Sequence, residues 1–222
     1  MNRKLNILKK LTIFGILGAL VYVFHIVLGG ILWKGYDHLM QPISDLTGTG
    51  APDKMLLSII TFIYGLFSIV FIISTYLYLK GSVPKLARVG MLIFLAMHLV
   101  SITYGLFPGD LPGAPITFNG IMHLVVTGLI VPLTILSPLL IGIGLKKLEA
   151  FKAFAGYSII TGIIIFIAGG TSVIFFANKL PYFGLIERIN IGSLQLWMFI
   201  FSLKLFKSDV EQITSTNSNI AV

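Results

Sequence analysis

Six long apolar stretches divide this sequence, and they constrain its fold more than any other feature. They cover roughly residues 11–33, 55–79, 88–107, 119–145, 153–177 and 188–206. A helix needs about 20 apolar residues to cross the hydrocarbon core of a bilayer. Only 11% of the residues are charged, whereas a soluble domain carries about 25%. The sequence therefore predicts an all-α polytopic membrane protein, built as a bundle of six transmembrane helices.

The first stretch follows several basic residues, as a signal peptide would. Its apolar run of about 23 residues is longer than the roughly 7–15 residues of a signal peptide's apolar region. No Ala-x-Ala cleavage site follows the run. We therefore expect residues 1–207 to form one transmembrane domain that retains this helix, and residues 208–222 to form a polar tail.

The basic residues are distributed unevenly between the two ends of the predicted bundle. Of the 16 Lys and Arg, four fall on one side: Lys34, Lys54, Lys179 and Arg188. The other twelve flank the termini and the second and fourth connections. The positive-inside rule places that side in the cytoplasm, which predicts a plasma-membrane protein with both termini and the tail cytoplasmic. Basic clusters beside apolar runs favour contacts with membrane lipids over nucleic acid, despite the net charge of +8.

Three histidines lie within the apolar stretches, all in the half nearest the predicted outer face. At about 1.5 Å per residue, His25 lies about 12 Å, His98 about 14 Å and His123 about 6 Å below the outer helix ends. Ionisable side chains at membrane depth usually face the bundle interior or a wet cavity. The outer connections above them hold most of the acidic residues: Asp37, Asp45, Asp53, Asp110 and Glu187. This pattern predicts a polar His/Asp site that opens to the extracytoplasmic face.

One hypothesis for this site is a metal-assisted hydrolase that acts on a lipid of the outer leaflet. Imidazoles and a carboxylate can hold Zn²⁺, which then acidifies a bound water. The expected metal ligands are His98, His123 and His25. Asp45 or Asp110 would serve as a further ligand or as the catalytic base. Other polar residues expected to contact a small-molecule or lipid ligand are Asn119, Glu187 and Arg188.

Other functions agree with the same residues. A transporter or lipid-binding protein without catalysis would use the polar pocket as a vestibule, although six helices without an internal repeat would have to form a homo-oligomer to transport. Haem ligation by His98 and His123 is disfavoured because their depths differ by about 8 Å. An accessory protein that binds a partner through its loops is a further alternative. The sequence leaves open whether the protein is an enzyme.

Each candidate residue also has a purely structural interpretation. A buried histidine can donate to a carbonyl on a neighbouring helix. Ser44, Asp45 and Asp110 can cap turns in their Pro- and Gly-rich loops. Glu187 and Arg188 can form an ion pair at the membrane edge. The choice between structural and functional roles depends on whether these side chains converge.

Several short motifs resemble an uncharacterised family of bacterial multi-pass membrane proteins, filed as a domain of unknown function. They are Gln41-Pro-Ile-Ser-Asp-Leu46, Gly50-Ala-Pro52, Gly105-Leu-Phe-Pro-Gly-Asp110, Asn119-Gly-Ile-Met-His123 and Gly184-Leu-Ile-Glu-Arg188. The resemblance spans essentially the whole chain and implies a six-helix membrane bundle with no assigned activity. The family often has a cysteine in its Phe-Pro-x-Asp loop. This chain contains no cysteine, which argues against an obligatory disulfide or thiolate here.

A partial resemblance links the chain to the alkaline ceramidase-like membrane hydrolases. Those enzymes combine a serine, an aspartate and three histidines around zinc in a seven-helix bundle. The resemblance would give catalytic roles to Ser44 and to Asp45 or Asp110, and zinc to the three histidines already named. The chain lacks the His-x-x-x-His pair of that family and has six predicted spans.

Overall fold

The computed structural model describes residues 3–208, so almost all of the predicted tail (208–222) lies outside the described residues. Six of its helices, counting α1 with α2, are long and apolar enough to cross a membrane, which confirms the predicted all-α fold. The α-helices are α1 Arg3–Leu11, α2 Phe14–Leu32, α3 Lys54–Leu79, α4 Lys85–Ser101, α5 Phe118–Leu145, α6 Lys152–Ala177 and α7 Phe183–Lys207. Three short 3₁₀ helices join them: η1 Ile43–Thr47, η2 Ile102–Gly105 and η3 Glu149–Phe151.

The first span differs from the predicted stretch because it extends back to Arg3 and is broken between α1 and α2. Backbone groups freed inside a bilayer need internal partners, and a single side chain of α7 supplies two of them here. The Ser202 hydroxyl donates to the Thr12 carbonyl (2.5 Å), and Ser202 Oγ accepts from the Ile16 N–H (3.1 Å). The break is thus stabilised by contact with α7.

The last helix begins at Phe183, five residues before the predicted start at residue 188. Tyr182, just before it, adopts a left-handed backbone conformation with φ of 67°. As a result, Glu187 and Arg188 lie inside the first turns of α7 and not at its edge. This shift decides what the two charged side chains can contact.

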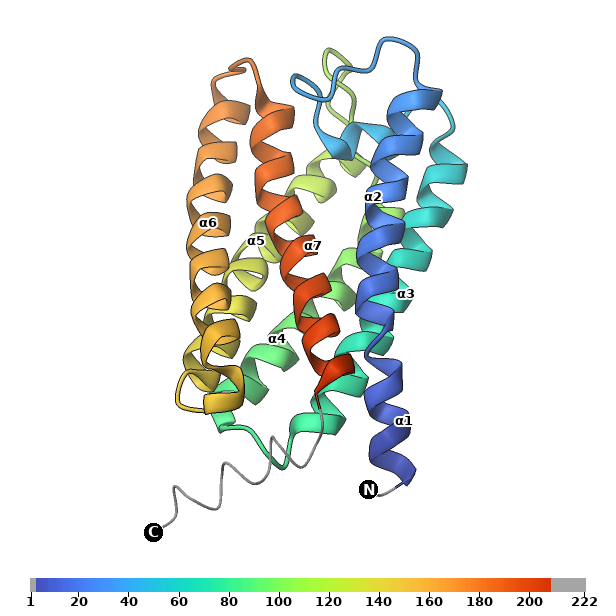
Figure 1. Cartoon of the computed structure of the whole chain (residues 1–222). Helices are drawn as coiled ribbons and strands as arrows, with labels where there is room; N and C mark the ends of the chain where they lie inside the picture. The colour runs from blue at the N-terminus through green and yellow to red at the C-terminus, as the bar shows by residue number, and fades with distance from the viewer. Residues whose placement is uncertain (1–2, 209–222) are drawn as a thin grey trace.

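The helices form a closed ring, because each of α2 to α7 packs on the helices before and after it and α7 returns to α2 (Figure 1). We call the end that carries α1 and the end of α7 the terminal end. The opposite end, which carries the connections 33–53, 106–117 and 178–182, is the loop end. Which of them faces the cytoplasm stays a prediction of the charge distribution.

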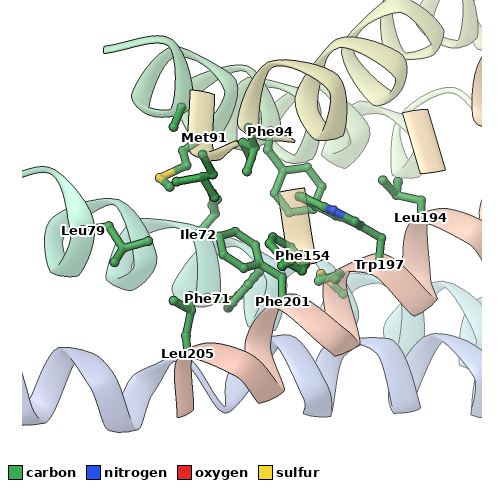
Figure 2. Close-up of a cluster of buried hydrophobic side chains, with 14 of the residues drawn as sticks. Phe71, Ile72, Leu79, Met91, Phe94, Phe154, Leu194, Trp197, Phe201 and Leu205 are labelled. Carbon is green, nitrogen blue, oxygen red and sulfur yellow. The ribbon is translucent and has the colours of Figure 1, made fainter. Parts of the chain in front are cut away.

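Large aromatic side chains fill the ring toward the terminal end (Figure 2). The Trp197 ring lies 5.3 Å from Phe94 and 5.5 Å from Phe201, measured between centroids, and Phe154 stacks on Phe201 at 4.7 Å. The Trp197 indole N–H donates to Ser158 Oγ at 2.8 Å, so its polar atom is satisfied in the core. The loop end is different, because polar side chains occupy the ring there.

Candidate functional site

A segment of the first connection, residues 33–50, covers the loop end; we call it the cap. Arg188 of α7 holds it in place. One guanidinium nitrogen donates to the Gln41 carbonyl (2.8 Å) and to the Gly184 carbonyl (2.9 Å). The other donates to the Tyr36 hydroxyl (2.8 Å) and to His38 Nδ1 (3.2 Å). The guanidinium also lies 5.6 Å from the Tyr36 ring centroid, a cation–π distance. Arg188 therefore joins α7 to the cap.

The first turn of α7 completes this junction. The Glu187 carboxylate accepts a hydrogen bond from the Ile43 N–H of the cap. The Leu185 N–H donates to the Leu39 carbonyl (2.9 Å), and the Gly184 N–H donates to the Met40 carbonyl (3.2 Å). These bonds give partners to the free N–H groups that every helix start leaves. A Cβ atom on Gly184 would collide with the Gln41 carbonyl, so this close approach requires glycine.

Burial shifts the pKa values of Tyr36 and His38, the two cap side chains that contact Arg188. It raises the pKa of Tyr36 to about 12, although the Arg188 charge and hydrogen bond partly oppose the shift. Burial and the Arg188 charge both lower the pKa of His38. Tyr36 therefore stays a neutral phenol that also donates to the Pro42 carbonyl (2.7 Å). Neutral His38 can accept from Arg188 through Nδ1.

Asp45, in the η1 part of the cap, is almost fully buried, at 6% exposure, and its Oδ2 has no hydrogen-bond partner. Burial raises its pKa from 3.8 to about 6. A buried carboxylate oxygen without a partner is unusual for a residue that only caps a turn. Ser44, its neighbour, is half-buried.

We expect Asp45→Asn to stabilise the protein at pH 7.5 and to flatten its pH dependence. Because the pKa in the folded state exceeds the unfolded value, folded protein binds the proton more tightly and stability falls as pH rises from about 4 to about 6. Two pKa units correspond to about 3 kcal/mol above pH 6. Thermal melting in detergent at pH 4.5 and 7.5 measures the effect. Asp37→Asn, an exposed position in the same cap, is the control; equal pH dependence of wild type and Asp45→Asn would contradict the prediction.

Asp110 fulfils the structural interpretation given above. Its carboxylate accepts from both the Thr117 N–H and the Thr117 hydroxyl, each at 2.7 Å. Thr117 in turn caps α5 by accepting from the Gly120 N–H (3.1 Å). The two Thr117 hydrogen bonds lower the pKa of Asp110, which keeps it ionised. Asn119, on the first turn of the same helix, is exposed.

The three histidines occupy separate places. His123 Nδ1 lies 3.0 Å from the Phe107 carbonyl, and its ring lies 4.6 Å from that of Tyr104, so it ties η2 to α5. His98 is buried between the rings of Phe94 (4.6 Å) and Tyr64 (5.7 Å). His25 is buried beside Tyr22 at 5.8 Å. Within residues 3–208, no group of three or more His, Cys, Asp or Glu side chains is arranged to hold a metal ion.

Four polar side chains line the ring at the loop end, and only one of them, His98, was a candidate from the sequence; we call Tyr22, Tyr64, His98 and Gln195 the tyrosine cluster. The Tyr22 and Tyr64 rings lie 4.7 Å apart. Gln195 Nε2 donates to the Tyr64 hydroxyl (2.7 Å). The His98 ring meets the Tyr64 ring edge-on at 5.7 Å. The helices α2, α3, α4 and α7 thus direct hydroxyl, amide and imidazole groups into the same region.

Several buried atoms around this cluster have no hydrogen-bond partner. They are both ring nitrogens of His25 and of His98, Gln195 Oε1 and Arg188 Nε. The side chains of His25, His98 and Gln195 are only 2%, 1% and 5% exposed, respectively. Buried polar groups in native proteins are nearly always paired with protein, water or ligand. Several unpaired polar atoms at the loop end of the ring are typical of a region that binds a polar ligand or water.

A crevice of about 330 Å³ opens beside the cluster, between α2 and α7. Apolar side chains form most of its wall, and Leu20, Val23 and Leu196 on its edges face the outside of the bundle. Three polar residues also line it: Tyr22, Arg188 and Gln195. Along α7 it runs from Arg188 to Phe199, a length of about 16 Å at the helical rise. A smaller crevice of about 220 Å³ between α6 and α7 has only Thr171 as a polar lining residue.

A ring of six membrane-length helices with a polar interior at one end defines a multi-pass membrane protein. A family model described as "Protein of unknown function (DUF998)" matches residues 16–204, so the chain belongs to this family. This confirms the resemblance drawn from the loop motifs. No curated protein and no solved structure matches the chain. The partial likeness to alkaline ceramidase-like hydrolases stays a prediction.

Proposed function

We propose that the protein binds an amphipathic molecule of the membrane, such as a lipid, in the crevice between α2 and α7 and does not convert it chemically. In this proposal the loop end faces the outside of the plasma membrane, as the basic residues predict. The apolar part of the ligand lies along the crevice and its polar part lies toward the loop end.

The composition of the crevice wall is the observation that carries this proposal. Small-molecule sites have volumes of about 300–1,000 Å³, mostly apolar walls and a few polar groups that fix orientation. The crevice meets this description, with Tyr22, Gln195 and Arg188 as its polar groups. The crevice between α6 and α7 is smaller and offers no charged group.

A zinc hydrolase has less support from the same residues. It would need His25, His98 and His123 around one ion with an aspartate nearby. His123 is instead hydrogen-bonded to the Phe107 carbonyl, and the Asp110 carboxylate accepts hydrogen bonds from Thr117. No metal-binding group of three is assembled in the described part of the chain. We therefore base the proposed function on binding and not on hydrolysis.

Gly192→Phe is expected to block the crevice. Gly192 lines it on α7, and a Cβ atom there meets no other atom within 4 Å, so the new ring can enter without disturbing the helices. The protein is reconstituted in nanodiscs that contain a phospholipid with a diazirine on its acyl chain. Photolabelling of residues 19–26 and 188–199 should fall about tenfold, the effect of losing about 1.4 kcal/mol of binding free energy.

Gly170→Phe is the matched control, because Gly170 is also exposed, also has open space around its Cβ position, and lies on α6 away from the crevice. Its labelling of residues 19–26 and 188–199 should equal that of the wild type. If Gly192→Phe labels there as strongly as Gly170→Phe, the crevice is not the binding site and the proposed function is wrong.

A further inference from the structure

Arg188 is the charged residue at the loop end of the crevice between α2 and α7. Four further residues of α7 line the crevice along the same helix face: Gly192, Gln195, Leu196 and Phe199. No other Lys, Arg, Asp or Glu among residues 3–208 lines this crevice. A ligand in the crevice therefore meets one charged side chain, and its charge is positive.

The guanidinium of Arg188 has one unused hydrogen-bond donor. A guanidinium has five N–H donors, and four of them bind two backbone carbonyls, a phenol oxygen and an imidazole nitrogen. The fifth donor, Nε–H, is buried and has no partner. Nε is the guanidinium nitrogen closest to the helix, whereas the two terminal nitrogens reach the cap. Because buried donors are nearly always paired in native proteins, this N–H is suited to an acceptor that a ligand supplies.

The charge of Arg188 favours an anionic acceptor. The four acceptors that it already has are neutral, and no carboxylate in the described part of the chain forms an ion pair with it. The neighbouring Glu187 carboxylate instead accepts from the Ile43 N–H of the cap. Hydrogen bonds to ionised groups are about twice as strong as those between neutral groups. The planar guanidinium also matches the oxygens of a phosphate or carboxylate.

An unpaired Nε does not identify a binding site by itself, as Arg88 illustrates. Its Nε is also buried without a partner, and one of its terminal nitrogens donates to the Lys80 carbonyl (3.4 Å). Arg88 lies on α4 at the terminal end, however, and lines neither of the two crevices. Arg188 combines the unused donor with a place on the crevice wall, and this combination carries the inference.

The depth of Arg188 suits the phosphate of a membrane lipid. It is the sixth residue of α7, so its Cα lies about 8 Å from the loop end of that helix. The 25 residues of α7 extend over about 37 Å, whereas the hydrocarbon core of a bilayer is about 30 Å thick. In a bilayer, Arg188 therefore lies near the boundary between acyl chains and head groups. The apolar wall from Gly192 to Phe199 lies at the depth of the acyl chains.

We propose that Arg188 binds a phosphate group, carried by the amphipathic ligand that occupies the crevice between α2 and α7. This inference rests on the proposed function and specifies its ligand class. Nε–H donates to a phosphate oxygen, and the guanidinium supplies the opposite charge. Because Nε is enclosed, side chains at this end of the crevice, among them Ile43 of the cap, move aside as the phosphate enters. A lipid phosphate and inorganic phosphate share this chemistry.

The wild-type protein in nanodiscs decides the question without any substitution. Two lipids with the same diazirine-bearing acyl chain are compared, phosphatidic acid and diacylglycerol, which differ only by the phosphate. We expect phosphatidic acid to label residues 19–26 and 188–199 about tenfold more strongly, the effect of one hydrogen bond to a charged group. Equal labelling by the two lipids, lost from both in Gly192→Phe, would overturn this inference and leave the proposed function standing. Absence of labelling by both at these residues would overturn the proposed function itself.

Arg188→Lys tests the guanidinium. Lysine keeps the positive charge but has no donor at the position of Nε and cannot donate in a planar fork. Labelling by phosphatidic acid should fall about fivefold, because a hydrogen bond is lost while the charge is kept, and labelling by diacylglycerol should not change. Arg88→Lys makes the same substitution at the terminal end and should label as the wild type does. Unchanged preference for phosphatidic acid in a folded Arg188→Lys protein would contradict the role of Arg188.

Glu187→Ala separates loss of the guanidinium from loosening of the cap. It removes the carboxylate that accepts from the Ile43 N–H, so it weakens the same junction and leaves Arg188 in place. It also removes the negative charge next to Arg188 in the chain. Labelling by phosphatidic acid should therefore equal or exceed that of the wild type. A fall as large as that in Arg188→Lys would mean that the intact cap governs labelling, and would overturn the assignment to Arg188.

Inorganic phosphate in excess, compared with sodium chloride at the same ionic strength, separates the two sources of the phosphate group. If it displaces phosphatidic acid and leaves diacylglycerol bound, the site accepts phosphate from water. If labelling by phosphatidic acid persists, the phosphate must be carried by the lipid. Either result supports recognition of phosphate, whereas displacement of both lipids to the same extent would count against it.

Discussion

Replacing Arg188 with methionine is expected to lower the free energy of unfolding by about 3 kcal/mol and to detach the cap from α7. Hydrogen bonds to charged groups each contribute about 1.5–3 kcal/mol, and Arg188 makes several that join the cap to the helix. The substitution leaves the Gln41 carbonyl without its guanidinium partner and removes the cation–π contact with Tyr36. Thermal melting in detergent measures the loss. The rate of tryptic cleavage after the exposed Lys34, in the same cap, should rise in parallel.

Lys179→Met is the control for this experiment. It removes one positive charge from the same end of the bundle at an exposed position. Its melting temperature and its cleavage after Lys34 should match those of the wild type. Arg188→Lys should fall between the two, because an ammonium cannot reproduce the planar, forked donation of a guanidinium. If Arg188→Met and Lys179→Met have the same melting temperature, then contacts other than those of Arg188 hold the cap.

The junction between α7 and the cap also explains one limit of prediction from sequence. Hydropathy located the six spans because each one is a continuous apolar run, and this signal is local. The signal that determines where α7 begins is not local. It depends on N–H groups of Gly184 and Leu185 that donate to Met40 and Leu39, more than 140 residues earlier in the chain. Glu187 and Arg188 were therefore expected at the edge of the last span, although they lie within α7.

The depth of the three candidate histidines in the bundle could be predicted from the sequence, but the direction in which each side chain points could not. Helical rise placed His25, His98 and His123 in one half of the bundle, and the structure has them there. Which way each ring points depends on how its helix is rotated against its neighbours, and side-chain packing decides that rotation. His123 turns toward the Phe107 carbonyl, whereas His98 packs between two aromatic rings. The sequence could suggest convergence of the three but could not establish it.

The tyrosine cluster had a weaker signal in the sequence. Tyrosine is common near membrane interfaces, where its ring lies at head-group level, so Tyr22 and Tyr64 did not stand out. Gln195 was the more informative residue, because an amide near the middle of a predicted span usually hydrogen-bonds to another helix. The structure gives it that partner, Tyr64 of α3. Only the arrangement of α2, α3 and α7 in space turns these residues into one cluster beside the crevice.

Gly144→Leu is expected to be at least as damaging as loss of Arg188, at about 3 kcal/mol or more, for a reason unrelated to the site. α4 and α5 approach so closely that a Cβ atom on Gly144 would collide with the backbone of Ala87. Across the same seam, a Cβ atom on Gly90 would lie 2.8 Å from the Ile141 backbone nitrogen. Backbone atoms cannot turn aside as a side chain can, so the helices would have to separate and lose their packing.

The control for Gly144→Leu lies on the same helix. Gly128 of α5 is exposed, and nothing lies within 4 Å of its Cβ position, so Gly128→Leu adds the same side chain without a collision. Size-exclusion chromatography and thermal melting in detergent compare the two variants. Gly128→Leu should elute and melt as the wild type does, whereas Gly144→Leu should aggregate or melt far earlier. Equal behaviour of both would mean that α4 and α5 do not meet through these glycines. The helices α4 and α5 would then contact each other through other residues at the terminal end. The crevice between α2 and α7, on the other side of the ring, would be unaffected.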